Sequence, residues 1–417
     1  MKIRNLSIFE FDNFAFTHPL SSYHQTSNYA IFKSEQGFDY DLIGLVDENN
    51  EIVAASLIII KKMGILFRYG YAPKGFLMDY YDENIIKEFT NLLIKHYYKK
   101  NMAFIKVNPE IQIGQVDFEN KKINYNKNKY LISTLERYNF KKLNTKKLFE
   151  TKIPAFNSII ALKNYNFNKL SKNTRNKIHK SQNSGIHLEK GNRDDIKIIY
   201  EFFKKQKNNP ISYYYNYYNA FYKDEKIDIF KLMINFEECL INLREKYEKE
   251  LEKNNNLSNL ILMNNTKDIL KKKMVSDKTL GTLNENIAYA TRCLAQNKEL
   301  CIGGAITIKY KNRINILISG YDKNYKQYCP NYNLYYSLLE EYKNEYDFID
   351  LNGITGDFTN ENPYKGLNDF KKGFNPYSFE YIGEFDFIIN PGLYKSMEEN
   401  GILAKEFNKK QKSINNS

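Results

Sequence analysis

The sequence predicts an α/β protein with two domains of similar topology and an antiparallel helical hairpin inserted in the second. Two observations carry this prediction. One order of strands and helix occurs twice along the chain, at residues 42–107 and 299–351, and a repeated order indicates a duplicated fold. Between the two copies, residues 237–297 change to the apolar spacing of helices.

The first copy begins with two β-rich runs joined by a polar turn over 42–62, which is typical of a β-hairpin. A strand near 65–73 follows, and then an amphipathic helix over 83–100 leads to a buried strand over 103–107. The elements expected in the second copy are a hairpin, a helix and a strand over 299–320, 331–346 and 347–351. Each copy therefore predicts one α/β domain.

Two segments between the copies carry apolar residues spaced by three and four, the heptad pattern of paired helices. These residues are Phe236, Leu240, Leu243 and Tyr247 on the first segment, and Leu280, Leu283, Ile287, Ala290 and Leu294 on the second. Asparagine-rich turns separate the segments, so an antiparallel hairpin is favoured. Two ordinary surface helices packed on the core remain the alternative.

The expected domain limits follow from these elements. Residues 1–150 form the first domain, which a C-terminal helix over 391–410 joins. The second domain takes 151–236 and 298–390, and the helical arm takes 237–297.

The positive charge is concentrated in one part of the chain. The formal net charge is +13, and residues 121–190 alone carry 17 Lys and Arg against three Asp and Glu. Such a block is either a solvated surface or the contact for a polyanion, such as nucleic acid, a nucleotide diphosphate or an anionic membrane face.

Several classes of protein are excluded by missing features. No apolar run approaches the roughly 18 to 20 residues that span a bilayer, and the chain begins with acids where a secretion signal needs an apolar stretch. The histidines and cysteines have no metal-ligand spacing, so no metal is expected. Motifs for NTP phosphates, dinucleotides or a nucleophilic serine are absent, and the turns before the two repeated helices are too bulky to cradle coenzyme A.

The segment 351–390 is the densest cluster of Gly, Asn and Pro, and long loops on a rigid scaffold commonly carry function. Within it, Phe370 and Lys371 are adjacent, so we expect Phe370 to enter the core and Lys371 to face a cleft. A lysine there would stabilise an oxyanion or hold a phosphate.

Taken together, the order and spacing of these segments resemble the Fem-type peptidoglycan bridge aminoacyltransferases over nearly the whole chain. The matching segments are HPLSSYHQTSNYAIFK, ILFRYGYAPKGFLMDY, AFIKVNPEI, SKNTRNKIHKSQNSGI, NPISYYYNYY, the helical insert, GITGDF, GLNDFKKGF and EYIGEFDF. The resemblance implies two tandem GNAT-like domains with a helical arm in the second. It also implies an enzyme that takes an amino acid from aminoacyl-tRNA.

The resemblance assigns roles position by position. Lys371, after Phe370, matches a catalytic lysine thought to bind phosphate and stabilise the oxyanion. Lys33 matches a lysine that contacts the diphosphate of the precursor, and Tyr213 a tyrosine of the same channel.

Two positions depart from the family pattern. Asn108 stands where members often have an aspartate suggested as a base, and an amide cannot remove a proton. Asn209 stands where an arginine is common, so the grip on phosphate would rest more on Lys33 and Lys371, with Arg175 or Lys177 as substitutes. Arg175, Lys177 and Lys180, on one basic helix, are the expected contacts to tRNA.

The predicted function is transfer of glycine, alanine or serine from aminoacyl-tRNA to the stem-peptide amine of a lipid-linked or UDP-linked peptidoglycan precursor. Aminoacyl-tRNA is a co-substrate, and no cofactor is expected. The expected location is the cytoplasm, with peripheral contact to the inner face of an anionic membrane left open. The alternatives are a related transferase with a lipid or protein acceptor, and a non-catalytic nucleic-acid-binding protein.

Overall fold

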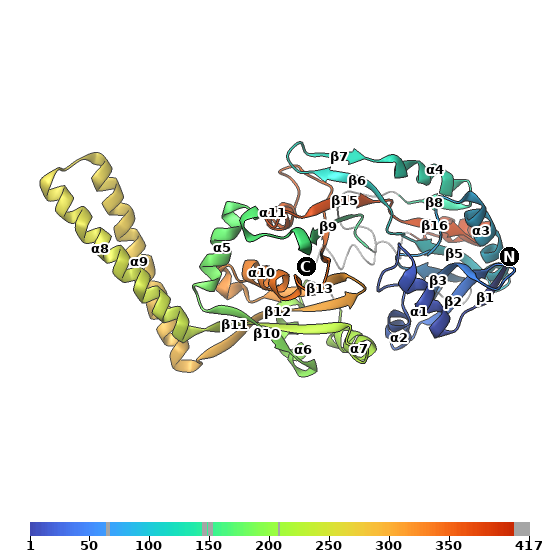
Figure 1. Ribbon diagram of the computed structural model, residues 1–417, viewed down its shortest axis with the longest axis horizontal. Helices are drawn as coiled ribbons and strands as arrows, with labels where there is room; N and C mark the ends of the chain where they lie inside the picture. Colours follow the sequence, from blue (N-terminus) through green and yellow to red (C-terminus); the bar gives the residue numbers. More distant parts are fainter. Residues whose placement is uncertain (64–66, 144–147, 149–152, 207–208, 404–417) are drawn as a thin grey trace.

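The computed structural model describes residues 1–403 apart from 64–66, 144–147, 149–152 and 207–208. Figure 1 shows two α/β domains side by side and a helical arm that extends away from the second domain. None of the described helices is both long enough and apolar enough to cross a membrane.

The first domain is built on a seven-stranded sheet with the spatial order β1-β2-β3-β4-β5-β16-β8. The strands are β1 (Lys2–Asn5), β2 (Asp39–Val46), β3 (Ile52–Met63), β4 (Phe67–Ala72), β5 (Met102–Val107), β16 (Phe385–Ile388) and β8 (Phe140–Lys142). Strands β2, β3 and β4 are antiparallel, and α3 (Glu83–Tyr98) returns the chain so that β5 runs parallel to β4.

The second domain is built on a nine-stranded sheet with the order β10-β11-β12-β13-β14-β9-β15-β6-β7. The strands are β10 (Ile186–Gly191), β11 (Ile227–Asn235), β12 (Glu299–Tyr310), β13 (Arg313–Tyr321), β14 (Phe348–Ile354), β9 (Phe156–Ala161), β15 (Tyr377–Tyr381), β6 (Gln112–Asp117) and β7 (Lys122–Tyr125). Helix α10 (Pro330–Tyr342) joins β13 to β14, which run parallel.

The duplication expected from the sequence is confirmed. In each domain an antiparallel hairpin leads through one amphipathic helix to a parallel neighbour, β4-α3-β5 in the first and β13-α10-β14 in the second. Helix α3 buries Ile86, Phe89 and Leu93 on the first sheet, because these side chains lie one turn apart on one face. The fold class of two GNAT-like domains is therefore as predicted.

The helical arm is also confirmed. It consists of α8 (Phe236–Met263) and α9 (Lys267–Gln296), which pack against each other as an antiparallel hairpin. Asn235 caps α8 by accepting from two backbone N–H groups of its first turn. The apolar seam near the second domain includes the predicted Leu240, Leu243 and Ala290.

The other helices cover the sheets and join the domains. They are α1 (Ile8–Thr17), α2 (Ser27–Ser34), α4 (Leu131–Glu136), α5 (Lys172–Gln182), α6 (Ile196–Phe203), α7 (Ile211–Tyr222), α11 (Lys365–Lys372) and α12 (Pro391–Glu399). Helix α2 of the first domain packs on α7 of the second, with the rings of Phe32 and Tyr217 3.7 Å apart. One apolar core thus spans both domains.

The two sheets depart from the expected domain limits at two places. Strands β6 and β7 lie within the expected first domain but belong to the second sheet, where β6 pairs with β15 and β7 pairs with β6. Strand β16 follows the second domain but pairs with β5 and β8 in the first sheet. Alternation of apolar residues shows which face of a strand is buried, yet it does not identify the neighbouring strand. Helix α12 packs on β5, and residues 404–410 of the expected C-terminal helix lie outside the described residues.

A buried ion pair fixes β16 in the first sheet. Lys106 Nζ on β5 lies 2.6 Å from Asp386 Oδ1 on β16, and both side chains are almost fully buried. The Tyr394 hydroxyl on α12 donates to the other carboxylate oxygen at 3.0 Å. The pair therefore ties a strand and a helix from the C-terminal end to the first domain.

We expect Asp386→Asn to lower the free energy of unfolding by about 3–5 kcal/mol, because the Lys106 ammonium would remain buried without its counter-charge. Urea unfolding measures this loss. Glu398→Gln is the control, since Glu398 pairs with Lys141 at the surface and its loss should be below about 1 kcal/mol. Equal losses in the two variants would contradict the role given to the buried pair.

Candidate functional site

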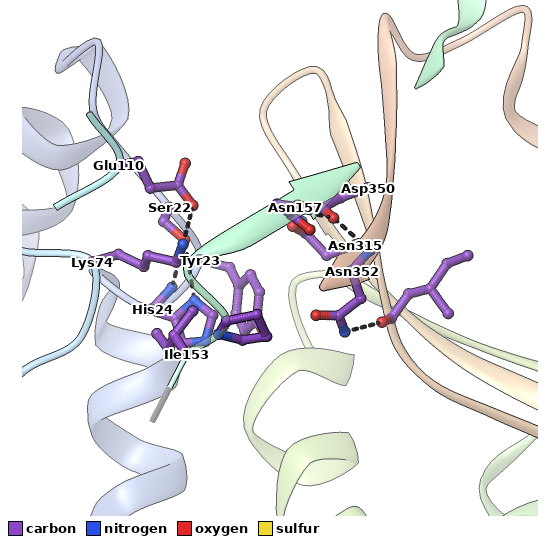
Figure 2. A pocket seen from close by; sticks show the side chains of 12 residues that line it. Ser22, Tyr23, His24, Lys74, Glu110, Ile153, Asn157, Asn315, Asp350 and Asn352 are labelled. Carbon is purple, nitrogen blue, oxygen red and sulfur yellow. Dashed lines mark hydrogen bonds and ion pairs between the residues drawn. The ribbon is translucent and has the colours of Figure 1, made fainter. Parts of the chain in front are cut away.

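A polar cleft opens between the two domains (Figure 2). The first domain lines it with the segment before α2 and with the ends of two strands, and the second domain lines it with β9, β13 and β14. The lining residues are Ser22, Tyr23, His24, Lys74, Glu110, Ile153, Pro154, Asn157, Asn315, Ile316, Asp350 and Asn352.

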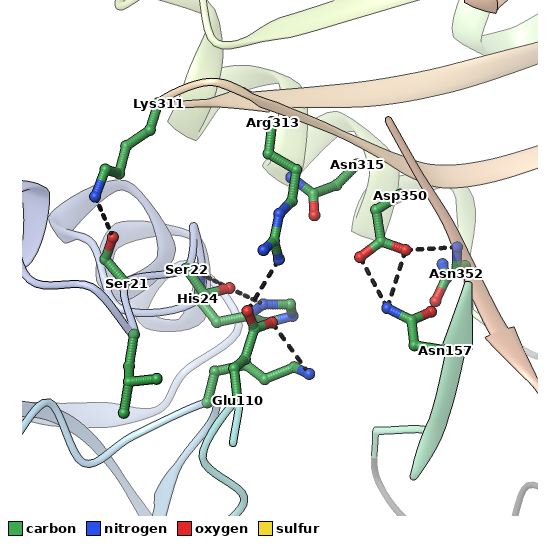
Figure 3. A network of polar contacts seen from close by, with 12 residues as sticks. Ser21, Ser22, His24, Glu110, Asn157, Lys311, Arg313, Asn315, Asp350 and Asn352 are labelled. Carbon is green, nitrogen blue, oxygen red and sulfur yellow. Dashed lines mark hydrogen bonds and ion pairs between the residues drawn. The ribbon is translucent and has the colours of Figure 1, made fainter. Parts of the chain in front are cut away.

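A carboxylate between two cations forms one side of the cleft (Figure 3). Glu110 Oε1 lies 3.2 Å from Lys74 Nζ, and Glu110 Oε2 lies 2.9 Å from Arg313 Nη1. Burial acts to raise the pKa of Glu110, but Lys74 and Arg313 outweigh it and lower this pKa to about 2. The cluster thus holds an ionised carboxylate and two cations, and Lys74 also lies over the Tyr381 ring at 4.0 Å.

A second carboxylate lies on the opposite side, within β14. Asp350 is buried and accepts from Asn157 Nδ2 at 2.9 Å and from the backbone N–H of Asn352 at 2.7 Å. Burial raises the pKa of Asp350 above its usual value, although Arg313 acts in the opposite direction. Asp350 is therefore the group in the cleft best suited to take up a proton.

His24 adds a neutral ring to the cleft. Its Nδ1 lies 3.1 Å from the Ser22 hydroxyl, and its ring lies against that of Tyr23 with centroids 3.9 Å apart. Burial, followed by the charge of Lys74, lowers the pKa of His24 to about 3. At neutral pH this imidazole is uncharged and acts by hydrogen bonding.

Lys33 and Tyr213, which the resemblance placed in one channel, come together at the junction of α2 and α7. Lys33 Nζ lies 5.7 Å from the Tyr213 ring centroid and 4.5 Å from that of Phe32, and it donates to Gln36 at 3.2 Å. The charge of Lys33 also contributes to lowering the pKa of His24, so Lys33 is close to the cleft.

The two asparagines that depart from the family pattern, Asn108 and Asn209, have different surroundings. Asn108 is buried, and its Oδ1 accepts from the backbone N–H of Lys74 at 2.8 Å. It thereby fixes the backbone at a cation of the cleft. Asn209 lies just before α7, where its carbonyl accepts from the Tyr200 hydroxyl at 3.0 Å.

Phe370 enters the core as expected, packed edge-on against Tyr332 and Tyr335 at 5.0 and 4.9 Å. Lys371 is buried, and its Nζ donates to the Gly353 carbonyl at 2.6 Å. Gly353 follows Asn352, which lines the cleft. Lys371 thus contacts the strand end that forms the cleft wall and is not itself among the lining residues.

The three expected tRNA contacts lie on α5, at the side of the second domain nearest the arm (Figure 1). Arg175 donates to the Asn168 carbonyl at 2.5 Å, and Lys177 donates to the Tyr332 hydroxyl at 3.0 Å. Lys180 is exposed. Burial lowers the pKa of Lys246 at the base of the arm, and the nearby charge of Lys180 contributes to this lowering. Helix α5 is therefore separate from the cleft lining.

Sequence reasoning assigned no role to most of the cleft residues. Lys74, Glu110 and His24 all lie inside segments that carry the family resemblance, directly after strands or before α2. Asp350 lies in the strand that ends the second repeat. Polar residues at the ends of equivalent strands were the available signal.

Within the described residues, no group of three or more His, Cys, Asp and Glu side chains could hold a metal ion.

Comparison with known proteins gives consistent matches along the chain. The model of the FemAB family matches residues 6–399. Aminoacyltransferase FemA of Staphylococcus epidermidis is 24% identical over 419 residues, covering 94% of this chain and 97% of that protein. Aminoacyltransferase FemA of Staphylococcus aureus is 23% identical over 416 residues with the same coverage.

A solved structure, that of FemX, shares the fold with a TM-score of 0.73 at 18% identity, covering 95% of this chain and 100% of that one. The predicted class of enzyme, an acyltransferase, is confirmed by these matches, and the alternative of a non-catalytic binder is set aside. Since the family model covers almost the whole chain, this protein belongs to the FemAB family.

Proposed function

We propose that this enzyme transfers glycine, alanine or serine from aminoacyl-tRNA to the stem-peptide amine of a peptidoglycan precursor, in the building of interpeptide bridges. The observation that carries the proposal is the cleft between the domains, with Asp350 on one side and the Lys74–Glu110–Arg313 cluster on the other. The similarity of this chain to aminoacyltransferase FemA supports the proposal. Aminoacyl-tRNA would be the co-substrate, and no further cofactor is proposed.

The reaction requires few catalytic groups. The ester of aminoacyl-tRNA is already activated, so the amine must lose a proton and reach the carbonyl carbon. Asp350 would accept that proton, and the Lys74 ammonium would donate to the oxyanion that forms. When the oxyanion collapses, the bond to the ribose oxygen of the tRNA breaks, and this oxygen takes up the proton from Asp350 to leave as a hydroxyl. Holding two reactants at attack distance supplies about 7–11 kcal/mol in favourable cases, and one oxyanion donor supplies about 3–4 kcal/mol.

The junction of α2 and α7 would hold the diphosphate of the acceptor. Lys33 supplies a cation there, and Tyr213 a ring and a hydroxyl beside it. Asn209 lies two residues before the start of α7, where its carbonyl accepts from the Tyr200 hydroxyl. A lipid-linked acceptor would place the enzyme at the inner face of the cell membrane, and a UDP-linked acceptor would not.

The proposal predicts a product that mass spectrometry detects. Incubation with a mixed pool of charged tRNAs and both precursors should add the mass of glycine, alanine or serine to the muropeptide. Asp350→Asn should lower kcat by about 10²–10⁴-fold, because the amide cannot accept the proton. The wild-type rate should fall with decreasing pH at a pH above the ordinary aspartate value of about 4, since burial raises this pKa.

Asp347→Asn is the matched control, because Asp347 pairs with Lys163 and Asn312 away from the cleft. If the added amino-acid mass appeared on a phospholipid or a protein instead of the muropeptide, the proposed acceptor would be wrong. Full activity of Asp350→Asn would overturn the role of this carboxylate.

A second prediction concerns Lys371. We expect Lys371→Met to lower kcat about 100-fold, because it removes a cation from the strand end that forms the cleft wall while keeping most of the side-chain volume. Lys372→Met, at the exposed neighbouring position, should leave kcat unchanged. A variant that loses stability but keeps the wild-type kcat in its folded fraction would show that Lys371 only supports Gly353.

A third prediction concerns the basic helix α5. Changing Arg175, Lys177 and Lys180 together to Gln should weaken tRNA binding and flatten its salt dependence between about 50 and 200 mM, because fewer counterions are released. Filter binding measures both quantities. The control changes the exposed Lys87 and Lys95 of α3 and Lys99, which follows this helix, to Gln. If both triple variants bind tRNA alike, α5 is not the contact.

A further inference from the structure

The distal end of the arm exposes a group of large apolar side chains. We define the arm tip as residues 253–278, the end of α8, the turn and the start of α9. Leu262 and Met263 are 86% and 84% exposed, the highest values for large apolar side chains in the described part of the chain. The tip also exposes Leu260, Leu270, Met274 and Val275. An apolar group of this size on a projecting turn is typical of an interaction site.

These side chains do not hold the two helices together. Polar contacts join α8 and α9 at the tip, with Asn254 Nδ2 donating to Asp277 Oδ1 at 2.8 Å and the Ser276 hydroxyl donating to Glu250 at 2.6 Å. Of the leucines in the tip, Leu257 is buried. Nearer the second domain the seam is apolar. The pairing at the tip thus leaves Leu262, Met263 and Met274 largely exposed, which indicates that they serve another contact.

The tip is also basic. It carries six lysines and two aspartates, whereas residues 237–252 at the base of α8 carry six glutamates against three Lys and Arg. Lys267, Lys271 and Lys272 lie on α9 within two turns of Leu270 and Met274. Apolar and cationic side chains therefore occur together at one end of the arm, and this combination is complementary to an anionic bilayer surface.

The composition of the tip favours lipid over nucleic acid. Residues 248–288 contain no aromatic residue, although 35 Tyr and 28 Phe occur in the chain, and no arginine lies between Arg244 and Arg292. Recognition of nucleic acid draws on aromatic stacking and on arginine forks to phosphate. An RNA backbone would also leave the exposed leucines and methionines in water, whereas the acyl boundary of a bilayer would bury them.

We propose that the arm tip binds the surface of an anionic membrane, with Leu262, Met263 and Met274 inserted at the acyl boundary and the lysines near lipid phosphates. Helix α8 has 28 residues, so the tip stands about 40 Å along the arm from the second domain (Figure 1). The enzyme would thus be held at a fixed distance from the bilayer. Insofar as the proposed function holds, this contact would bring the cleft to lipid-linked acceptors.

The test is co-sedimentation of the full chain with vesicles of phosphatidylglycerol and phosphatidylcholine, and with vesicles of phosphatidylcholine alone. We expect binding to the anionic vesicles that weakens with salt, and at least tenfold weaker binding to the neutral ones. Leu262→Ser with Met263→Ser and Met274→Ser should lower the affinity for anionic vesicles at least tenfold. Changing Lys267, Lys271 and Lys272 to Gln should lower it to a similar degree.

The matched control changes three apolar residues exposed elsewhere, Ile8, Phe9 and Ile241, to Ser, and should bind as the wild type does. Wild-type affinity in both tip variants would overturn the proposal. The proposal would also be overturned if a tip variant bound vesicles as the wild type does but bound tRNA more weakly. The same holds if such a variant kept its vesicle binding but lost self-association measured by sedimentation. The assay contains no tRNA or muropeptide, so its outcome is independent of the proposed reaction.

Discussion

The cleft depends on one buried carboxylate at the point where the chain passes from the first sheet to the second. Glu110 lies between β5 and β6, and it pairs with Lys74 of the first domain and Arg313 of the second. A buried charge is stable only while its partners are in place, so moving the domains apart would remove Arg313 and leave this carboxylate with Lys74 alone. The chain passes back from the second sheet to the first between β15 and β16, beside this segment. There the Ile382 N–H donates to the Ile111 carbonyl at 2.7 Å. The position of the two cleft walls follows from this junction.

Two carboxylates face this cleft in environments that separate their pKa values. Glu110 is held ionised by two cations, whereas burial makes the charged form of Asp350 less favourable. Such a separation assigns different tasks to chemically similar groups. Glu110 orders the cations, and Asp350 is left able to exchange a proton. Asn108, which stands where the family pattern often has an aspartate, accepts from the backbone N–H of Lys74. In the proposed reaction the carboxylate that takes up the proton is therefore Asp350, on the other side of the cleft.

The duplicated order of elements and the seam of the arm could be predicted from the sequence, because both depend on local spacing of apolar residues. The pairing of β6 with the second sheet and of β16 with the first could not be predicted, since the choice of a neighbouring strand depends on contacts between residues far apart in the chain. The resemblance placed Lys33 and Tyr213 in one channel, and in the structure Lys33 Nζ lies 5.7 Å from the Tyr213 ring centroid. Asp350 and Arg313 were missed because they become neighbours only when β13 and β14 lie side by side. Lys371 was expected to face the cleft; its ammonium donates to the Gly353 carbonyl, next to the lining residue Asn352.

The charge distribution also separates the surfaces that would bind large partners. Helix α5 is packed directly onto the segment that carries Lys371, because the Ser171 N–H donates to the Gly373 carbonyl at 3.1 Å and Lys177 reaches Phe370 through Tyr332. A polyanion on α5 would therefore be placed relative to the cleft by rigid contacts rather than by a linker. The acidic base of α8, residues 237–252, lies between this helix and the basic tip, and its negative charge would disfavour contact with a polyanion there. Two basic surfaces separated by an acidic one can serve two different partners at the same time.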